Sequence, residues 1–250
     1  MKIPVLVICA LLYCAPALAV EDGLVVLTDS RATIMQVPIQ GTSISELFDM
    51  LLSIRIAPKD KFEARADYEK RRNEVYRNET VGFHKVTDVF VFIDERVPRY
   101  SAERKGYEIY IPNAVTVKEE PKNYPAQTMF GSRMEATRQS AATFGLKFAN
   151  LRQMDDPSSK GLTSLTLLMP YTPEQARADD ANLCVVYLVR LAPPYVADDW
   201  DPSKMTVGGA SHNSTSKRYV VGQLTEVRVV RTTDGKVLFH DEVLWKKDAR

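Results

Sequence analysis

The sequence predicts an α+β fold in which a mostly antiparallel β-sheet is combined with two helices near the N-terminus and one short helix near residues 172–182. Three observations lead to this prediction. Residues 43–77 follow helical patterns, and most segments after residue 86 are rich in β-branched and aromatic residues. Hydrophobic residues make up 45% of the 250 residues, which suffices to bury a core.

The first 19 residues have the features of a secretory signal peptide. Lys2 precedes an apolar run over residues 3–15, and Ala17 and Ala19 form the small-x-small pattern of a cleavage site. The run is shorter than the ~20 apolar residues that a membrane-spanning helix needs, although an uncleaved anchor helix is the alternative. We therefore expect cleavage after Ala19, export to the periplasm or the medium, and no transmembrane segment afterwards.

Cleavage would leave a neutral chain with one cysteine. The full chain has 33 Lys and Arg against 32 Asp and Glu, and the loss of Lys2 makes the two counts equal. Phosphate binding needs a basic surplus, so we expect no nucleic-acid partner. Cys9 and Cys14 lie in the signal, so no intramolecular disulfide would be possible. Cys184 lies in the apolar run 183–189 and is expected to be a buried, inert thiol.

The first predicted helix covers residues 43–54. Ser43 and Glu46 have the spacing of a capping box, and Pro58 closes the segment. The apolar residues recur at i, i+3, i+4, i+7 and i+8, which predicts one buried stripe formed by Ile44, Leu47, Phe48, Leu51 and Leu52.

A second helix is predicted from Phe62 to about Arg77. This segment is rich in helix-forming residues, but its apolar face is thin. Its basic residues could form a patch for an anionic ligand. Acidic residues are interleaved throughout, which favours a solvated helix face instead.

The remaining segments predict strands, with one helix among them. The runs that favour strands are 86–93, 107–111, 162–169, 183–191 and 219–230. Thr172, Pro173 and Gln175 have the pattern of a helix start, and that helix should extend to about Asn182. The Asp-Gly pair within 232–236 predicts a hairpin. Residues 129–149 fit a helix and a strand equally well.

Domain organisation is simple. No sharp change in composition divides residues 20–250, so we expect one β-rich domain after the signal peptide. The longest stretch without a periodic pattern is 194–217, which is predicted to be a loop. Loops of this length are uncommon and are either mobile or functional.

Three segments together resemble a family of uncharacterised exported proteobacterial proteins. Residues 58–70, PKDKFEARADYEK, are similar to its "PK-x-x-FE" segment. Residues 123–131, NYPAQTMFG, followed by FGLKF at 144–148, are similar to a portion in which two strands form a hairpin after Phe-Gly. Residues 173–176, PEQA, and the hairpin at 233–237, TDGKV, resemble later landmarks of the family.

The chain departs from the family pattern at two positions. Thr128 stands where Asn is usual, and Ala64 stands where a helix cap would fit. The resemblance implies secretion, an α+β fold with much sheet, and a β conformation for 129–149. It implies no activity, so no functional residue is transferred.

No motif marks a catalytic, cofactor or metal site. His84, His212 and His240 show no zinc-ligand spacing, and the Gly-x-Ser-x-Gly and nucleotide-binding glycine patterns are absent. We therefore expect no cofactor.

The candidate ligand residues all lie in the predicted loop. Asp198, Asp199 and Asp201 surround Trp200, which could indicate a calcium loop or a carbohydrate-binding edge, although the calcium-loop spacing is not met. Ser211 and His212 follow two glycines and could indicate a hydrolase site. A solvated loop is the competing interpretation.

These observations favour a non-enzymatic exported protein that binds an unidentified protein or envelope partner, since edge strands of such folds can pair with other chains. One alternative is a hydrolase acting on an envelope or extracellular substrate, with a site assembled from distant residues. Another is a carrier of small molecules or lipids, with a cavity between helix 43–54 and the sheet.

Overall fold

The computed structural model describes residues 19–21, 23–27, 32–94, 96–116, 122–124, 140–151, 164–179, 181–200 and 216–242. Most of the predicted signal peptide, including Ala17, lies outside these residues. Ala19 is the first residue of a short strand and is paired with Val26. No helix among the described residues is both long and apolar enough to cross a membrane.

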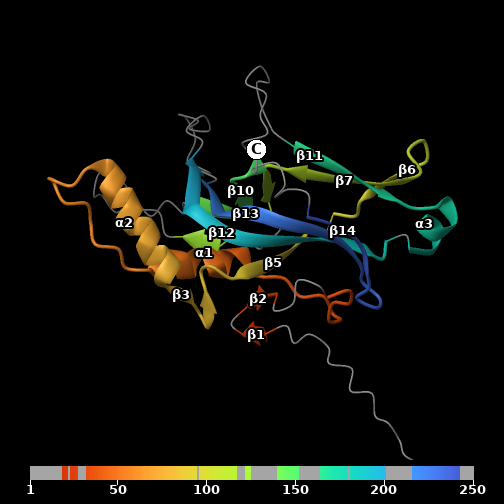
Figure 1. Cartoon of the computed structure of the whole chain (residues 1–250), viewed down its shortest axis with the longest axis horizontal. Helices are drawn as coiled ribbons and strands as arrows, with labels where there is room; N and C mark the ends of the chain where they lie inside the picture. Colours follow the sequence, from red (N-terminus) through yellow and green to blue (C-terminus); the bar gives the residue numbers. More distant parts are fainter. Residues whose placement is uncertain are drawn as a thin grey trace, which may run out of the picture.

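A nine-stranded sheet forms the centre of the molecule, and seven of its strands follow the order β1-β2-β5-β12-β13-β10-β8 (Figure 1). β14 pairs with β13, and β9 pairs with β10, beside this path. The strands are β1 (Ala19–Glu21), β2 (Leu24–Val26), β5 (Val89–Asp94), β8 (Ala114–Thr116), β9 (Lys122–Tyr124), β10 (Ser140–Phe148), β12 (Leu183–Trp200), β13 (Ser216–Arg231) and β14 (Val237–Asp241). All pairs are antiparallel except β10 with β13, which confirms the predicted α+β fold with a mostly antiparallel sheet.

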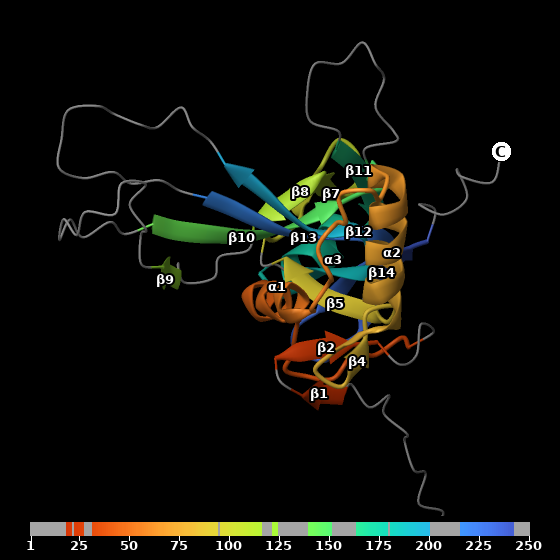
Figure 2. The ribbon, with the colours of Figure 1, turned by 90° about the vertical axis from the view of Figure 1, so that its left-hand side faces the viewer.

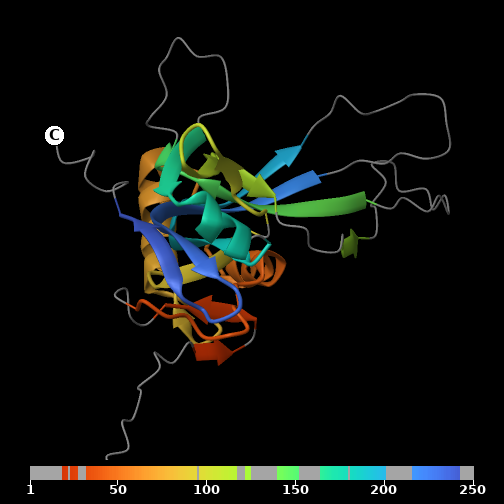
Figure 3. The ribbon, with the colours of Figure 1, turned by 90° about the vertical axis from the view of Figure 1, so that its right-hand side faces the viewer.

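Strand β12 extends well beyond its predicted end at residue 191, and β13 begins at Ser216, slightly earlier than predicted. The loop predicted over 194–217 is therefore too long, because β12 continues to Trp200 and β13 begins at Ser216. Pairing is interrupted between Leu191 and Val196 and then resumes with Val196 opposite Val220. The interruption is a bulge, which bends a strand without ending it. Figures 2 and 3 show the ends of β10, β12 and β13 extending together beyond the rest of the described fold.

Helix α1 (Ile44–Ser53) packs its apolar face on β10, β12 and β13. Half of the predicted capping box forms, since Ser43 Oγ accepts a hydrogen bond from the Glu46 amide at 3.4 Å, whereas the Ser43 amide donates to the Gly23 carbonyl at 3.0 Å instead of to Glu46. Four stripe residues are at most 1% exposed, namely Ile44, Leu47, Phe48 and Leu51. The prediction was wrong for Leu52, which is 54% exposed because it lies at the margin of the stripe.

Helix α2 (Arg65–Asn78) begins three residues later than predicted. The preceding turn explains the difference. The Asp60 carboxylate accepts a hydrogen bond from the Phe62 amide at 2.8 Å, and the Glu63 amide donates to the Asp60 carbonyl at 3.1 Å. Residues 60–63 therefore form a separate turn. A two-stranded hairpin, β3 (Thr80–Val81) with β4 (His84–Lys85), follows α2.

The opposite end of the molecule contains the second sheet and the third helix (Figure 1). The second sheet has the order β11 (Ser164–Pro170), β7 (Gly106–Pro112) and β6 (Arg99–Ser101). Helix α3 (Pro173–Asp179) begins as predicted, with Thr172 and Gln175 exchanging hydrogen bonds of 3.0 and 3.2 Å. It ends earlier than predicted, because Ala181 takes a left-handed backbone conformation with φ 62°.

The structure shows the conformation of the predicted hairpin at 232–236 and of the second part of the segment 129–149, which fitted a helix and a strand equally well. Gly235, with φ 72°, occupies the turn between β13 and β14, where a left-handed residue is required. Residues 140–148 form β10, in agreement with the β alternative, while residues 125–139 lie outside the described residues. Cys184 is buried as predicted, 7% exposed and without a disulfide.

Candidate functional site

Of the candidate ligand residues in the predicted loop, three lie on β12 and three lie outside the described residues. Asp198, Asp199 and Trp200 are the last residues of β12, opposite Arg218, Lys217 and Ser216 of β13. Asp198 is exposed and lies 3.9 Å from the Arg218 guanidinium. Asp201, Ser211 and His212 lie outside the described residues.

The two described histidines are on separate sheets. His84 on β4 is buried, and its ring lies edge-on to Phe90 with centroids 6.5 Å apart. His240 on β14 is exposed. No group of three or more His, Cys, Asp or Glu side chains that could hold a metal ion occurs in the part of the chain that the structure describes.

Three buried carboxylates that sequence patterns did not indicate could be taken for catalytic acids or bases. Asp94, at the end of β5, accepts hydrogen bonds from the Tyr187 hydroxyl at 2.8 Å and from Arg96 Nε at 2.8 Å. It borders a hollow of about 170 Å³. Burial raises the pKa of Tyr187 far above its usual value, so its phenol stays neutral. The carboxylate is occupied by fixed donors and leaves no free base, so this cluster is a clamp between β5 and β12.

The second carboxylate forms an ion pair inside the fold. Glu226 and Arg228, two positions apart on the same face of β13, are 5% and 1% exposed, with Arg228 Nε 2.6 Å from Glu226 Oε1. Arg228 also donates to the Ala32 carbonyl at 3.1 Å. The pair therefore fixes the segment before α1 against the sheet.

The third carboxylate, Asp179, joins the end of α3 to the hairpin. Arg231 Nη2 donates to it at 3.1 Å, and the Tyr171 hydroxyl also donates to it. Burial, assisted by this hydrogen bond, raises the pKa of Tyr171. These contacts hold the last residue of α3 against the hairpin. In all three clusters the carboxylate is already paired, so none presents a free acid or base to a substrate.

The interface between α1 and the sheet, where a carrier cavity was predicted, is filled by side chains. Phe48 of α1 meets Phe144 of β10 edge-on, with ring centroids 5.7 Å apart. A hollow of about 230 Å³ lies away from this interface, at the β12 bulge beside Pro193 and Pro194.

Another hollow, about 410 Å³ in volume, is lined by nine residues, of which eight have apolar side chains. We call it the apolar hollow. Its lining residues are Val37, Pro38, Ile39, Ile93, Val97, Ala181, Leu183, Cys184 and Thr232. None carries a charge. Val37 and Val97 remain 45% and 48% exposed, and nearby Ile34 is 55% exposed. The combination of a concave apolar surface and exposed aliphatic side chains is typical of binding sites.

Backbone contacts position the walls of the apolar hollow. The Met35 amide donates to the Gly235 carbonyl at 2.7 Å, and the Val237 amide donates to the Thr33 carbonyl at 2.9 Å. These bonds hold the segment before α1 beside the β13–β14 turn, and Figures 1 and 3 both show the two segments side by side. Cys184 lies in the lining, where burial raises the pKa of its thiol to about 11.

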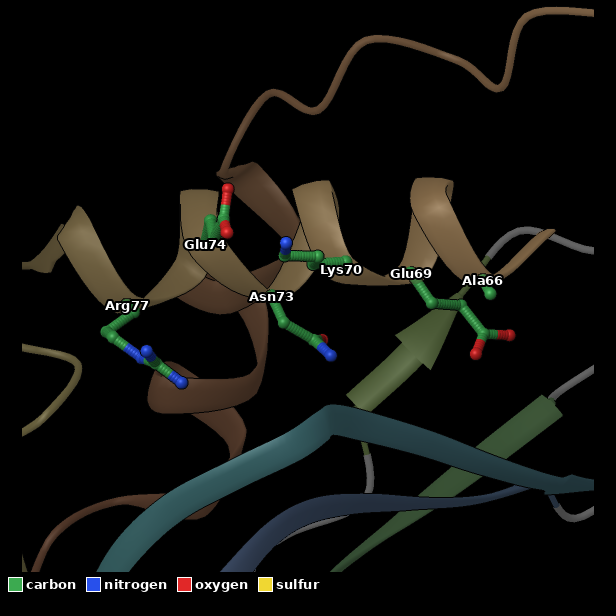
Figure 4. Close-up of a pocket in the computed structure, with 6 residues that line it drawn as sticks. All are labelled: Ala66, Glu69, Lys70, Asn73, Glu74 and Arg77. Atoms are coloured by element: carbon green, nitrogen blue, oxygen red, sulfur yellow. The ribbon is translucent and has the colours of Figure 1, made fainter. Parts of the chain in front are cut away.

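A further hollow, about 430 Å³ in volume, runs along α2, and five of its six lining residues have polar or charged side chains; we call it the polar hollow. Figure 4 shows the six residues that line it, all from α2: Ala66, Glu69, Lys70, Asn73, Glu74 and Arg77. The side chains of Glu69, Asn73 and Arg77 point towards the side where β12 runs, whereas the Glu74 carboxylate points away from it. Charges of both signs alternate here, as expected for a solvated helix face.

Sequence patterns indicated neither hollow. The apolar hollow combines residues from five separate segments, and only Cys184 among them had been noted for its own sake. Comparisons with protein-family models, with curated proteins and with solved structures found no match to this chain.

Proposed function

We propose that this chain is a non-enzymatic, exported binding protein that takes an apolar segment of a partner protein into the apolar hollow. The observation that carries the proposal is the uncharged lining of this hollow together with the exposed aliphatic side chains of Val37 and Val97 at its rim. Covering them would remove apolar area from water, which contributes about 25 cal/mol per Å².

The chemistry of the lining favours an apolar occupant over a charged one. Thr232 is the only lining residue with a polar side chain, so a buried charge would have no counter-ion among these residues. A partner side chain such as Leu, Ile or Phe needs no such compensation. The volume lies within the ordinary range of binding pockets, roughly 300–1,000 Å³.

The proposed location is the periplasm or the medium. The signal-like residues 1–19 support export, and the resemblance to exported proteobacterial proteins supports it independently. The partner would then be an envelope or secreted protein.

Site-specific photo-crosslinking in cells tests the proposal. A photoreactive amino acid is placed at Val97 of the full chain and, as a control, at Leu168, which is 40% exposed on β11 and does not line the apolar hollow. We expect adducts from position 97 but not from position 168, and we expect mass spectrometry to locate them in apolar segments of one partner.

A matched pair of variants completes this test. Val97→Asp should abolish co-purification of the cross-linked partner, because a carboxylate would be desolvated in an apolar interface. Leu168→Asp should leave co-purification unchanged. Equal cross-linking at both positions, or undiminished co-purification with Val97→Asp, would contradict the proposal.

The alkylation rate of Cys184, which lines the same hollow, can report whether the hollow is occupied. With a pKa near 11 its thiolate fraction at pH 8 is roughly a hundredfold below that of an ordinary cysteine, so alkylation should be slow and should accelerate as pH rises. Binding of the partner should slow it further. Alkylation is measured by peptide mapping, which separates Cys184 from Cys9 and Cys14, and a rate unaffected by saturating partner would count against occupancy of the hollow.

A further inference from the structure

A smaller hollow borders the apolar hollow and shares one of its residues. This is the hollow of about 170 Å³ beside Asp94, and we call it the arginine hollow after two of its lining residues, Arg96 and Arg99. Val97 lines both hollows, and its side chain is 48% exposed. Ile93 and Asp94, the last two residues of β5, line one hollow each. A partner segment that covers Val97 is therefore within reach of both hollows.

The two hollows differ in charge. No charged residue lines the apolar hollow, whereas four line the arginine hollow, namely Asp94, Arg96, Arg99 and Glu108. Two of these charges are already matched within the fold. Arg96 Nε donates a hydrogen bond to Asp94 at 2.8 Å, and the same carboxylate accepts from the Tyr187 hydroxyl at 2.8 Å. These bonds hold the Arg96 guanidinium in place at the edge of the hollow and neutralise Asp94.

Arg99 is the charge of the arginine hollow that the fold leaves without an ion pair. Glu108 lies opposite Arg99 in the β6–β7 ladder, but its carboxylate forms its ion pair with Arg104, at 3.4 Å. The side chain of Arg99 is exposed and forms no ion pair with any residue that the structure describes. Three guanidiniums, those of Arg96, Arg99 and Arg104, therefore meet two carboxylates, and one positive charge is in excess.

We propose that the partner segment presents an acidic side chain to Arg99, next to the apolar side chain that it places in the apolar hollow. This inference rests on the proposed function and adds the chemistry of the partner's sequence, an apolar residue with Asp or Glu close to it. A carboxylate matches the planar guanidinium with two parallel hydrogen bonds. A basic residue in the same place would be repelled by Arg96 and Arg99.

The two hollows would contribute differently to binding. Burial of an apolar side chain is not screened by salt and supplies most of the affinity. An exposed ion pair is weak and is screened by salt, but it discriminates between partners and speeds their encounter. Binding should therefore weaken moderately as salt is added, and part of this salt dependence should come from Arg99.

Variants of Arg99 test the proposal. The probe is a synthetic peptide containing the partner segment that cross-links at position 97, and its Kd for the full chain is measured by fluorescence anisotropy. Arg99→Glu should weaken binding about tenfold and Arg99→Gln about threefold. Arg99→Gln should also flatten the dependence of Kd on salt. Arg55→Glu makes the same charge change at an exposed residue that lines neither hollow, and it should leave Kd unchanged.

Charge reversal in the peptide separates a direct contact from a distortion of β6. Replacing the acidic residue of the peptide by Lys should weaken binding to the wild-type chain and restore binding to Arg99→Glu. A distorted strand would not be repaired by a change in the peptide. Arg99→Gln provides a second check, because it does not place two carboxylates opposite each other in the β6–β7 ladder.

Each outcome decides the proposal. Weakening by Arg99→Glu together with rescue by the Lys peptide supports it. A cross-linked segment without Asp or Glu within about four residues of the adduct, the reach of a short extended chain, overturns it. Equal binding by Arg99→Glu and Arg55→Glu also overturns it, while loss of co-purification with Val97→Asp still supports the proposed function. Equal cross-linking at positions 97 and 168 overturns the proposed function and this inference with it.

Discussion

The two N-terminal helices are neighbours in sequence but are stabilised in different ways. Helix α1 places four side chains in the core with at most 1% exposure, and Ser43 caps its first turn. Helix α2 is four residues longer, yet it buries only Tyr76 and has no side-chain cap, since Ala64 occupies that position. A helix that is polar all round depends on ion pairs or on a partner for its stability.

The one buried residue of α2 makes an aromatic contact with β12. The rings of Tyr76 and Tyr195 stack with centroids 4.5 Å apart and planes inclined by 23°. Tyr195 reaches this position from the β12 bulge with φ 68°, a left-handed conformation that is strained for a bulky side chain. This strained conformation directs the Tyr195 ring towards α2, and we infer that positioning the ring is a role of the bulge. The comparison therefore predicts that α1 unfolds with the core, whereas α2 can detach alone.

The largest effect is expected in α1. Phe48→Ala should destabilise the protein by about 3–5 kcal/mol, because it removes a buried ring and leaves a cavity against Phe144. Denaturant unfolding measures this loss. Leu52→Ala, on the exposed side of the same helix, should change stability by less than about 0.5 kcal/mol. Similar losses for the two variants would show that α1 is not part of the core.

A smaller and more local effect is expected in α2. Tyr76→Ala should cost about 2 kcal/mol, and the coupling with Tyr195→Ala in a double-mutant cycle should be about 1 kcal/mol. Hydrogen exchange should show lost protection over residues 65–78 while β12 and β13 stay protected. Tyr76→Phe should be nearly neutral, since its hydroxyl bond to the Leu51 carbonyl is long at 3.5 Å. Uniform loss of protection across the fold would contradict independent detachment.

Local patterns predicted the elements whose determinants are close in sequence. The Ser43–Glu46 cap, the Thr172–Gln175 capping box and the Gly235 turn each involve residues within three positions, and all three form. The α+β class was predictable for the same reason, because helical and alternating patterns are local.

Features set by distant contacts were not predictable in this way. The absence of a periodic pattern over 194–217 predicted a loop, but pairing with β13 across the bulge extends β12 to Trp200. The apolar hollow combines residues from Val37 to Thr232, and no spacing in the sequence reveals that they meet. The same limit applies to Asp94, which is paired by Tyr187 from 93 positions away.

The smallest changes in stability are expected from substitutions at the N-cap positions of the two helices. Ser43→Ala removes the cap of α1 and should cost about 1 kcal/mol, whereas Ala64→Ser supplies a cap to α2 and should stabilise it by about 0.5–1 kcal/mol. Ala64 already has the extended backbone of a cap residue, with φ −64° and ψ 148°, so the serine hydroxyl can reach the free amides without rearrangement.

Hydrogen exchange over residues 65–78 measures the gain, and Ala66→Ser is the matched control. The same substitution two positions further on lies inside the helix, where serine is a weaker helix former than alanine, so protection should fall slightly. If Ala64→Ser leaves exchange unchanged, the Asp60–Glu63 turn already fixes the start of α2 and fraying there is not what limits the helix. If exchange slows only in α2 while global unfolding is unaltered, the helix behaves as a separately stabilised surface element, as its polar faces and single buried tyrosine require.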